Sequence, residues 1–562
     1  MRSILTSLGI TVGLMALFEP LGLIQNSSWA EDHSSSPAVP HLEGTGPYRR
    51  KVTGATPEAQ QYFDQGLNLL FAFNLDEAIR AFEAATACAP DCAMAYWGLA
   101  VAHGPHYNNL SVPPQHAKGA WEALTKAREL SQPCTAAEKA LIGALGKRYA
   151  NPQPEDRKPL DKAYSDALRE VWKQFPHDAD IGSLFAESAM NLHPWDLWTR
   201  DLKPQPGTQE ILSTLEAVLA LSPSHPLANH LYVHAMEASP TPEKADDAAD
   251  QLRFATPGLG HMVHMPSHID VRRGRWQAAI EANQRAIDAD RNYRRVVPRQ
   301  GLFRMYMAHN HCMLAFAAMM QGESQRSIEA ARAMIAEIPK DWMERDENLE
   351  YADSLLIFPI EVLMRFGRWD DILKEPIPSE RYPVSRSLHF SARALAHATQ
   401  GRTDEAREAQ KAFREVMAKI PKDRTVRASS AADLLAVADA QLEGEILFKE
   451  GKINEGLKAL RQAVANEDKL KYNEPPNWMS PVRHALGASL LRAGKPAEAE
   501  PVYREDLVNW PDNGWSLYGL ARSLKGQGKK QEAAEVQKRF ERVWQKADVK
   551  LTSSCFCQAE QP

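Results

Sequence analysis

The chain has 562 residues, of which 25% are charged, and its formal net charge at pH 7 is −6. A chain of this length can form several domains or one extended array. A nucleic-acid-binding protein needs a basic face, and no such face stands out in this sequence, so we expect no nucleic-acid partner.

The amino-terminal segment has the features of a secretory signal. A positive charge at Arg2 precedes an apolar run over residues 10–18, and residues 28–30 form a small-x-small cleavage pattern. Glu19 and Pro20 interrupt the apolar stretch, which is too short to span a membrane comfortably. We therefore expect an exported protein, periplasmic or secreted, with no stable membrane span.

Six cysteines would then face an oxidising environment. Cys88 and Cys92 flank Pro90 and could form a disulfide or remain thiols, and their spacing leaves both outcomes open. Cys555 and Cys557 lie in a polar tail, which we predict to be unpaired and disordered, with a redox or metal-binding appendage as the alternative.

Beyond residue 55 the composition and the three- and four-residue spacing of apolar side chains predict helices throughout. Small residues, aromatics and prolines recur within this pattern at a fixed period. Gly494 and Gly528 are 34 residues apart, as are Ala499 and Ala533. The other positions that define the period are Gly66, Ala78, Phe82, Ala85, Pro90, Gly274, Ala279, Ala286, Gly322, Pro339, Gly367, Gly401, Ala406, Gly451, Ala463, Gly487, Tyr503, Pro511, Ala521 and Phe540.

This spacing resembles the tetratricopeptide repeat family. The resemblance implies an all-α fold, a right-handed α-solenoid of helix hairpins with a concave inner face, in about eight to ten units over residues 56–545. The expected organisation is a signal peptide (1–30), a flexible lead-in (31–55), an amino-terminal repeat region (56–200), a histidine-rich repeat region (201–345), a carboxy-terminal repeat array (346–546) and a polar tail (547–562).

Three short sequence segments resemble those of a group of exported bacterial repeat proteins. They are residues 93–98 (AMAYWG), residues 261–269 (HMVHMPSHI) and residues 481–484 (PVRH). This likeness supports the fold more than any activity.

Histidine is concentrated between Pro223 and Cys312, which hold eight of the eighteen histidines. A 34-residue template places His230 and His234 in the fifth and ninth positions of one hairpin, and His264 and His268 in the same positions of the next. In this repeat family those positions line the concave face. His261 lies three residues before His264 and would share that side.

Imidazole is the commonest protein ligand for transition metals. Two four-apart pairs on adjacent helices can converge without ordering a loop, so we predict a metal site at His230, His234, His261, His264 and His268. Nitrogen-rich ligation suits copper, zinc or iron, and nearby methionines favour copper slightly. Further candidate ligands, which would allow a two-metal centre, are His103, His106, Glu237, His309 and Cys312.

Three functions remain open at this point. The first is a scaffold that holds a peptide or protein segment in its concave groove and carries a metal site. The second is a metalloenzyme, an oxidoreductase or hydrolase that uses copper, iron or zinc. The third is a metal-free adaptor that binds peptides or proteins. Histidines on a groove can also bind carboxylates or stack on aromatics without metal. We interpret two aromatic stretches, residues 191–198 and 472–478, as packing at irregular junctions.

Overall fold

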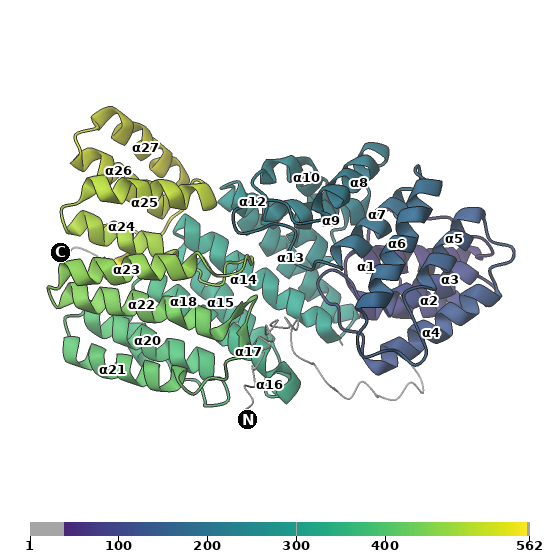
Figure 1. Ribbon diagram of the computed structural model, residues 1–562, viewed down its shortest axis with the longest axis horizontal. Helices are drawn as coiled ribbons and strands as arrows, with labels where there is room; N and C mark the ends of the chain where they lie inside the picture. The colour runs from purple at the N-terminus through teal and green to yellow at the C-terminus, as the bar shows by residue number, and fades with distance from the viewer. Residues whose placement is uncertain (1–38, 299–300, 559–562) are drawn as a thin grey trace, which may run out of the picture.

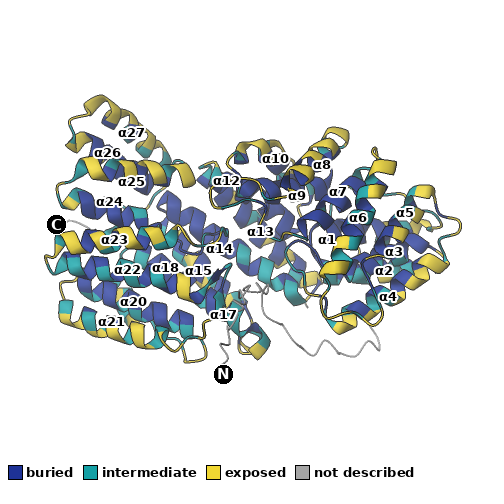
Figure 2. Ribbon diagram, in the orientation of Figure 1, coloured by how far each residue is buried: buried dark blue, intermediate teal, exposed yellow. Residues whose placement is uncertain are grey.

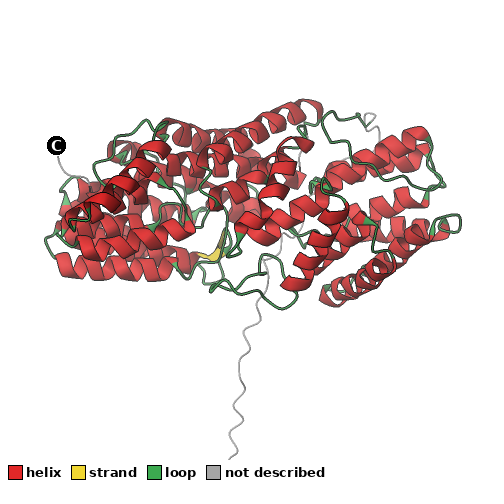
Figure 3. Cartoon of the chain, turned by 90° about the horizontal axis from the view of Figure 1, so that it is seen from above, coloured by secondary structure: helices red, strands yellow, loops and turns green. Residues whose placement is uncertain are grey.

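The computed structural model describes residues 39–298 and 301–558, whose regular secondary structure is almost all helix (Figure 3). The amino-terminal helices are α1 (Pro57–Phe71), α2 (Leu75–Cys88), α3 (Ala93–Ala102), α4 (Pro114–Glu129), α5 (Ala136–Leu145), α6 (Lys158–Gln174), α7 (Ala179–Met190) and α8 (Thr208–Leu221). The central helices are α9 (Pro226–Glu237), η1 (Pro242–Ala245), α10 (Asp246–Ala255), α11 (Gly260–His264), α12 (Pro266–Arg272), α13 (Trp276–Val296), η2 (Gly301–Phe303), α14 (Arg304–Gln321) and α15 (Ser324–Glu337).

The carboxy-terminal helices complete the array. They are α16 (Lys340–Met343), η3 (Asp346–Asn348), α17 (Leu349–Leu356), α18 (Phe358–Arg365), α19 (Trp369–Lys374), α20 (Pro383–Thr399), α21 (Thr403–Met417), α22 (Ala431–Lys449), α23 (Ile453–Glu467), α24 (Val482–Arg492), α25 (Pro496–Asn509), α26 (Gly514–Gly526), α27 (Lys530–Val543) and η4 (Phe556–Gln558). Within the described residues the only strands are β1 (Thr425–Val426) and β2 (Ser429–Ser430), an antiparallel pair with Thr425 opposite Ser430.

Consecutive helices pack as antiparallel hairpins, which stack into an elongated array (Figure 1). Helices α20–α27 form one end, α1–α8 form the other, and α9–α14 lie between them. Buried residues follow the inner faces of the hairpins, while exposed residues follow their outer faces (Figure 2). The predicted fold class, an all-α solenoid of tetratricopeptide-like hairpins, is confirmed.

The periodic glycines serve two structural purposes. One set ends the first helix of a hairpin in the left-handed region, where a side chain would be strained, as at Gly494 (φ 73°) and Gly528 (φ 77°). The other set lets helices approach across an aromatic ring. Gly487 and Gly519 both face the Tyr503 ring, where an added Cβ would lie 2.4 and 2.1 Å from Cζ.

The described part of the predicted lead-in, residues 39–55, lies against α1 and α7. The Arg50 guanidinium binds both Asp178 (2.8 Å) and Asp180 (2.6 Å), and the Tyr48 hydroxyl donates to Asp180 (2.9 Å). His225 Nε2 lies 3.1 Å from the same Asp180 carboxylate. This buried network joins the amino-terminal segment to α7 and to the start of α9.

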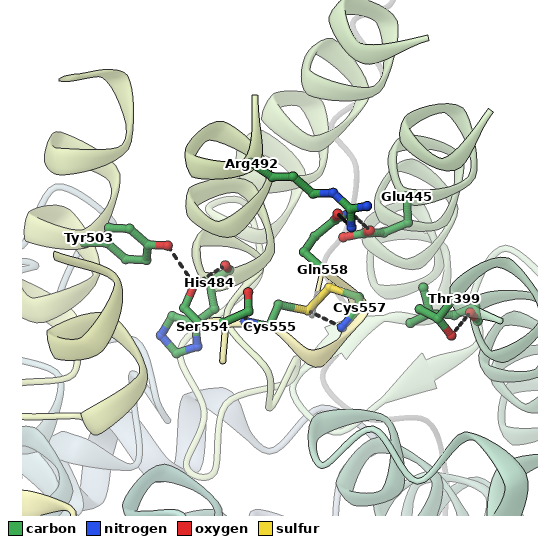
Figure 4. The surroundings of a disulfide bond; sticks show 11 residues. Thr399, Glu445, His484, Arg492, Tyr503, Ser554, Cys555, Cys557 and Gln558 are labelled. Carbon is green, nitrogen blue, oxygen red and sulfur yellow. Dashed lines mark hydrogen bonds between the residues drawn. A yellow bond between two sulfur atoms is a disulfide. The ribbon is translucent and has the colours of Figure 1, made fainter. Parts of the chain in front are cut away.

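The carboxy-terminal tail, where the structure describes it, is packed and not disordered. Cys555 and Cys557 form a disulfide, so the prediction of an unpaired end is wrong (Figure 4). The Ser554 hydroxyl lies 2.6 Å from the Tyr503 hydroxyl and donates to the carbonyl of His484. Polar side chains of the tail thus find partners in the repeat array, which composition alone does not reveal.

The other described cysteines are free thiols, so Cys88 and Cys92 are not bridged. Among the described helices, none combines the length and the apolar character that a bilayer crossing requires.

The contact between Gly519 and Tyr503 gives a stability prediction. Gly519→Ala forces a methyl group against a fully buried ring, and we expect the free energy of unfolding to fall by about 1–3 kcal/mol. Gly143→Ala in α5 is the matched control, because nothing lies within 4 Å of the added carbon, and it should be neutral or stabilise by up to ~1 kcal/mol. Chemical denaturation of both variants measures the difference. Equal effects would contradict the close-packing account.

A second prediction concerns acid stability. Burial raises the pKa of Asp180, but hydrogen bonding to His225 and the charge of Arg50 outweigh burial and hold the pKa at about 2. Because the pKa of this carboxyl is lower in the folded protein than in the unfolded chain, where it is near 4, the ionised carboxylate stabilises the fold by about 2 kcal/mol at neutral pH. This stabilisation is lost as the pH falls from about 4 towards 2. Asp180→Asn should therefore lower the melting temperature at pH 6, and the gap from the parent protein should narrow at pH 3. A gap that is constant with pH would exclude this carboxylate as its source.

Candidate metal centre

The candidate site lies on the central helices α9, α11, α12 and α14. Helix α9 supplies His230 and His234, one turn apart, and α11 supplies His261 and His264. Pro266 begins α12, which supplies His268. Proline is accommodated there because the first turn of a helix leaves its N–H groups unpaired. The template placed His230, His234, His264 and His268 on neighbouring hairpins, and the structure divides the predicted five-histidine site into two groups.

The first group of histidines is His230, His234 and His261. One ring nitrogen from each lies within 4.8 Å of the other two, and all three side chains are buried. His230 Nδ1 lies 2.8 Å from the Phe71 carbonyl oxygen, and His234 Nδ1 lies 3.2 Å from Glu237 Oε1. Because a neutral imidazole donates to an acceptor through one nitrogen, Nε2 of both rings is left with a lone pair.

The second group is His264, His268 and His309, the last of which comes from α14. Their ligand nitrogens also lie within 4.8 Å of one another. His264 Nδ1 lies 2.7 Å from Asn283 Oδ1 on α13, which directs His264 Nε2 towards His268 Nε2 at 2.8 Å. His309, a secondary candidate from the sequence, therefore completes a second triad.

Two carboxylates flank the second triad. His268 Nδ1 lies 2.5 Å from Glu237 Oε2 and 3.0 Å from Glu474 Oε2. Glu237 is the last residue of α9, whereas Glu474 lies in the connection between α23 and α24. Carboxylates behind a ligating histidine fix its orientation and raise its basicity. Glu237 thus belongs to the site, but the structure places it behind the histidines.

Burial keeps most of these imidazoles neutral. It lowers the pKa of His230, His261 and His264 well below 6.5, with further lowering from neighbouring histidines, and it lowers the pKa of His309 to about 3. At His268 burial also acts downward, but Glu237 and Glu474 outweigh it and raise the pKa. Neutral imidazole is the form that binds metal.

The two triads are neighbours, with ring centroids 5.4 Å apart for His234 and His268 and 5.9 Å apart for His261 and His264. They open into a groove of about 4900 Å³ that runs along the inner face of the array. Four triad histidines line this groove, His234, His261, His268 and His309, and outside the triads His103, His106, His116 and His193 line it as well. An ion held by either triad would thus be reachable from the groove.

Three secondary candidates lie outside both triads. His103 Nδ1 faces His116 Nδ1 at 3.2 Å, away from the cluster. His106 packs on Phe73, with ring centroids 4.5 Å apart, and is in neither triad. The Cys312 thiol contacts the Met334 sulfur at 3.1 Å, and burial raises its pKa. The metal role predicted for Cys312 therefore lacks support, because the thiol points at another helix.

Sequence analysis missed two residues that position the site. Asn283 lies in the middle of α13, and the sequence gives no signal that it faces His264. Glu474 lies about 200 residues beyond the histidines. It belongs to the aromatic stretch interpreted as packing, and the connection between α23 and α24 brings it to His268.

The comparisons with known proteins concern the repeat. A family profile described as "Tetratricopeptide repeat" matches residues 63–103 and 484–547, near the two ends of the described array. These segments include α2 and α25–α27, where the periodic glycines and aromatics are most regular. The tetratricopeptide repeat is therefore identified in these two segments, and the profile does not match the histidine-rich centre. No curated protein matches the chain.

Solved structures that align with the chain have low overall similarity. The Cut9–Hcn1 heterotetramer of the APC/C has a TM-score of 0.29 at 13% identity, covering 89% of this chain and 79% of that chain. The human IFIT1 dimer with m7Gppp-AAAA has a TM-score of 0.31 at 14% identity, covering 86% and 90%. The P58(IPK) TPR domain has a TM-score of 0.21 at 11% identity, covering 88% and 99%. Scores of this size support no inference about ligands or partners.

Proposed function

We propose that this protein binds transition-metal ions at the two histidine triads and presents them to the groove. The observation that supports this most is the set of buried nitrogens without partners: His230 Nε2, His234 Nε2 and both nitrogens of His261. Leaving a buried polar atom unpaired costs about 1–3 kcal/mol, and metal coordination would offset that cost. The outward Nδ1 atoms of His230 and His234 are meanwhile held by acceptors, as in known metal sites.

The triads match the donor set that such a metal needs. Three nitrogens per triad leave room for a further ligand from the groove, which is the arrangement of catalytic metal sites. The ligand nitrogens of each triad lie within 4.8 Å of one another, and His264 Nε2 lies 2.8 Å from His268 Nε2. Ligand atoms around a metal with bonds near 2 Å are roughly 3–3.5 Å apart, so small ring rotations would have to adjust these separations when an ion binds.

Copper is the first choice among candidate metals, ahead of zinc and iron. The ligands are nitrogens, and the methionines beside them, Met236, Met262 and Met265, are fully buried. Soft neighbouring side chains of this kind favour copper slightly. A bound metal would supply Lewis-acid or redox chemistry, while Glu237, Glu474 and Asn283 orient the histidines.

A second function, peptide or protein binding, is favoured by the size of the groove. A volume of about 4900 Å³ far exceeds the 300–1,000 Å³ typical of small-molecule pockets. A polypeptide segment could lie along the inner face and reach the triads. The signal-like amino terminus lies outside the described residues, and we propose export to the periplasm or beyond from its sequence alone.

Metal analysis of full-length protein, purified without a polyhistidine tag, tests the main proposal. After reconstitution with Cu²⁺, Zn²⁺ or Fe²⁺ we expect up to two ions per chain by mass spectrometry. The His230→Ala/His234→Ala and His264→Ala/His268→Ala pairs should each remove about one ion. His41→Ala/His177→Ala, at two exposed histidines outside the triads, should retain full metal content. Protein that folds yet takes up no metal would refute a metal centre.

The role of Asn283 yields a sharper prediction. Asn283→Ala removes the acceptor that orients His264 and should weaken metal binding at the second triad by about 10–100-fold. Asn283→Asp keeps an acceptor oxygen and should restore most of the affinity. Competition with a chromophoric chelator measures both variants. Similar affinities for the alanine and aspartate variants would show that Asn283 has no positioning role.

A further inference from the structure

Aromatic side chains flank the first triad where it meets the groove. The Trp195 ring meets the His234 ring edge-on, with centroids 5.1 Å apart and planes at 77°, and it stacks with Tyr107 at 5.2 Å. On the other flank, the Tyr306 ring lies 4.4 Å from His261. Trp195, His234, His261 and Tyr306 therefore form a row along the groove, since the two histidine rings are themselves 6.4 Å apart.

Trp195 is held in an unfavourable conformation at this position. Its φ of 57° lies in the left-handed region, where a bulky side chain is rare and costs of order 1–3 kcal/mol. The Tyr107 hydroxyl accepts the Trp195 backbone N–H at 3.1 Å and helps to fix it. Even so, 42% of the Trp195 side chain is exposed, so burial of the indole does not explain the strain. Strained, exposed residues of this kind cluster at ligand sites.

Other exposed apolar side chains gather on the same groove. The described chain has six large hydrophobic residues that are exposed, and three of them line the groove: Trp195, Leu202 and Val296. Trp195 and Leu202 belong to one connection, between α7 and α8. This concentration of exposed apolar side chains on the inner face indicates that the groove binds a ligand with apolar surface, and not a purely ionic one.

We propose that Trp195, with Tyr107 behind it, and Tyr306 form a slot that receives an aromatic ring above His234 and His261. Flat rings pack on one another in offset or edge-on geometry, which this row offers from both sides. The ring belongs either to a small aromatic molecule or to a side chain of a polypeptide in the groove. This inference rests on the proposed function, since it assigns the substrate class of the same metal site.

Binding of N-acetyl-L-tyrosinamide and N-acetyl-L-leucinamide to the full chain, followed by saturation-transfer NMR, tests the slot. We expect the tyrosine compound to bind and the leucine compound to bind at least fivefold more weakly. Trp195→Ala should raise the Kd of the tyrosine compound about tenfold, and Trp195→Phe should raise it less. Phe254→Ala is the matched control, because Phe254 is 72% exposed but lies outside the groove, and it should leave the Kd unchanged.

Equal binding of the two compounds, or a Trp195→Ala variant with unchanged Kd, would overturn the inference. Metal content is measured on the same samples, with and without metal loading. Ring binding without metal uptake would refute the metal centre alone, whereas metal uptake without ring discrimination would refute the slot alone. A nine-residue Gly-Ser peptide with one central tyrosine separates the two sources. Binding tenfold tighter than the amide identifies a polypeptide ligand, and equal binding identifies a small molecule.

Discussion

The structure of the site depends on how buried imidazoles are held from behind. His230 and His264 each place Nδ1 on an acceptor from another helix, at the end of α1 and in the middle of α13, and His234 places Nδ1 on Glu237 at the end of its own helix. These contacts fix ring orientation and leave Nε2 turned inwards. Burial then keeps the rings neutral, because it disfavours the charged form. A cluster of neutral, inward-facing nitrogens follows from these two effects together.

Much of the fold could be predicted from the sequence because its period reflects close packing. A glycine at 487 or 519 is needed to admit the Tyr503 ring, and a glycine at 494 or 528 is needed to turn between helices. Each requirement restricts one position to one residue type, so the pattern is visible without coordinates. The packed tail could not be predicted in this way, since Ser554 and Cys557 pack through contacts made once and never repeated.

The site itself was predictable only as far as the repeat extends. Equivalent positions in two hairpins identified His230, His234, His264 and His268, and the structure places the first two in one triad and the last two in the other. Cys312 was a further candidate ligand on the next hairpin, yet its thiol contacts Met334, and His309, three residues earlier on α14, joins a triad instead. Asn283 and Glu474 carry no periodic signal, since they reach the histidines from a helix flank and from a distant connection.

The irregular connections, and not the repeats, distinguish this groove from a generic one. The stretch between α7 and α8 brings Trp195 beside His234, and the stretch between α23 and α24 brings Glu474 behind His268. In the sequence both stretches are typical of packing at a helix junction, because aromatic and proline residues occur in packed junctions as well as in binding sites. Hairpins provide a rigid frame whose inner face is fixed by helix packing. Connections that fold back onto that face can then add a carboxylate or an exposed ring without disturbing the frame, which is how a repetitive scaffold acquires a single specialised site.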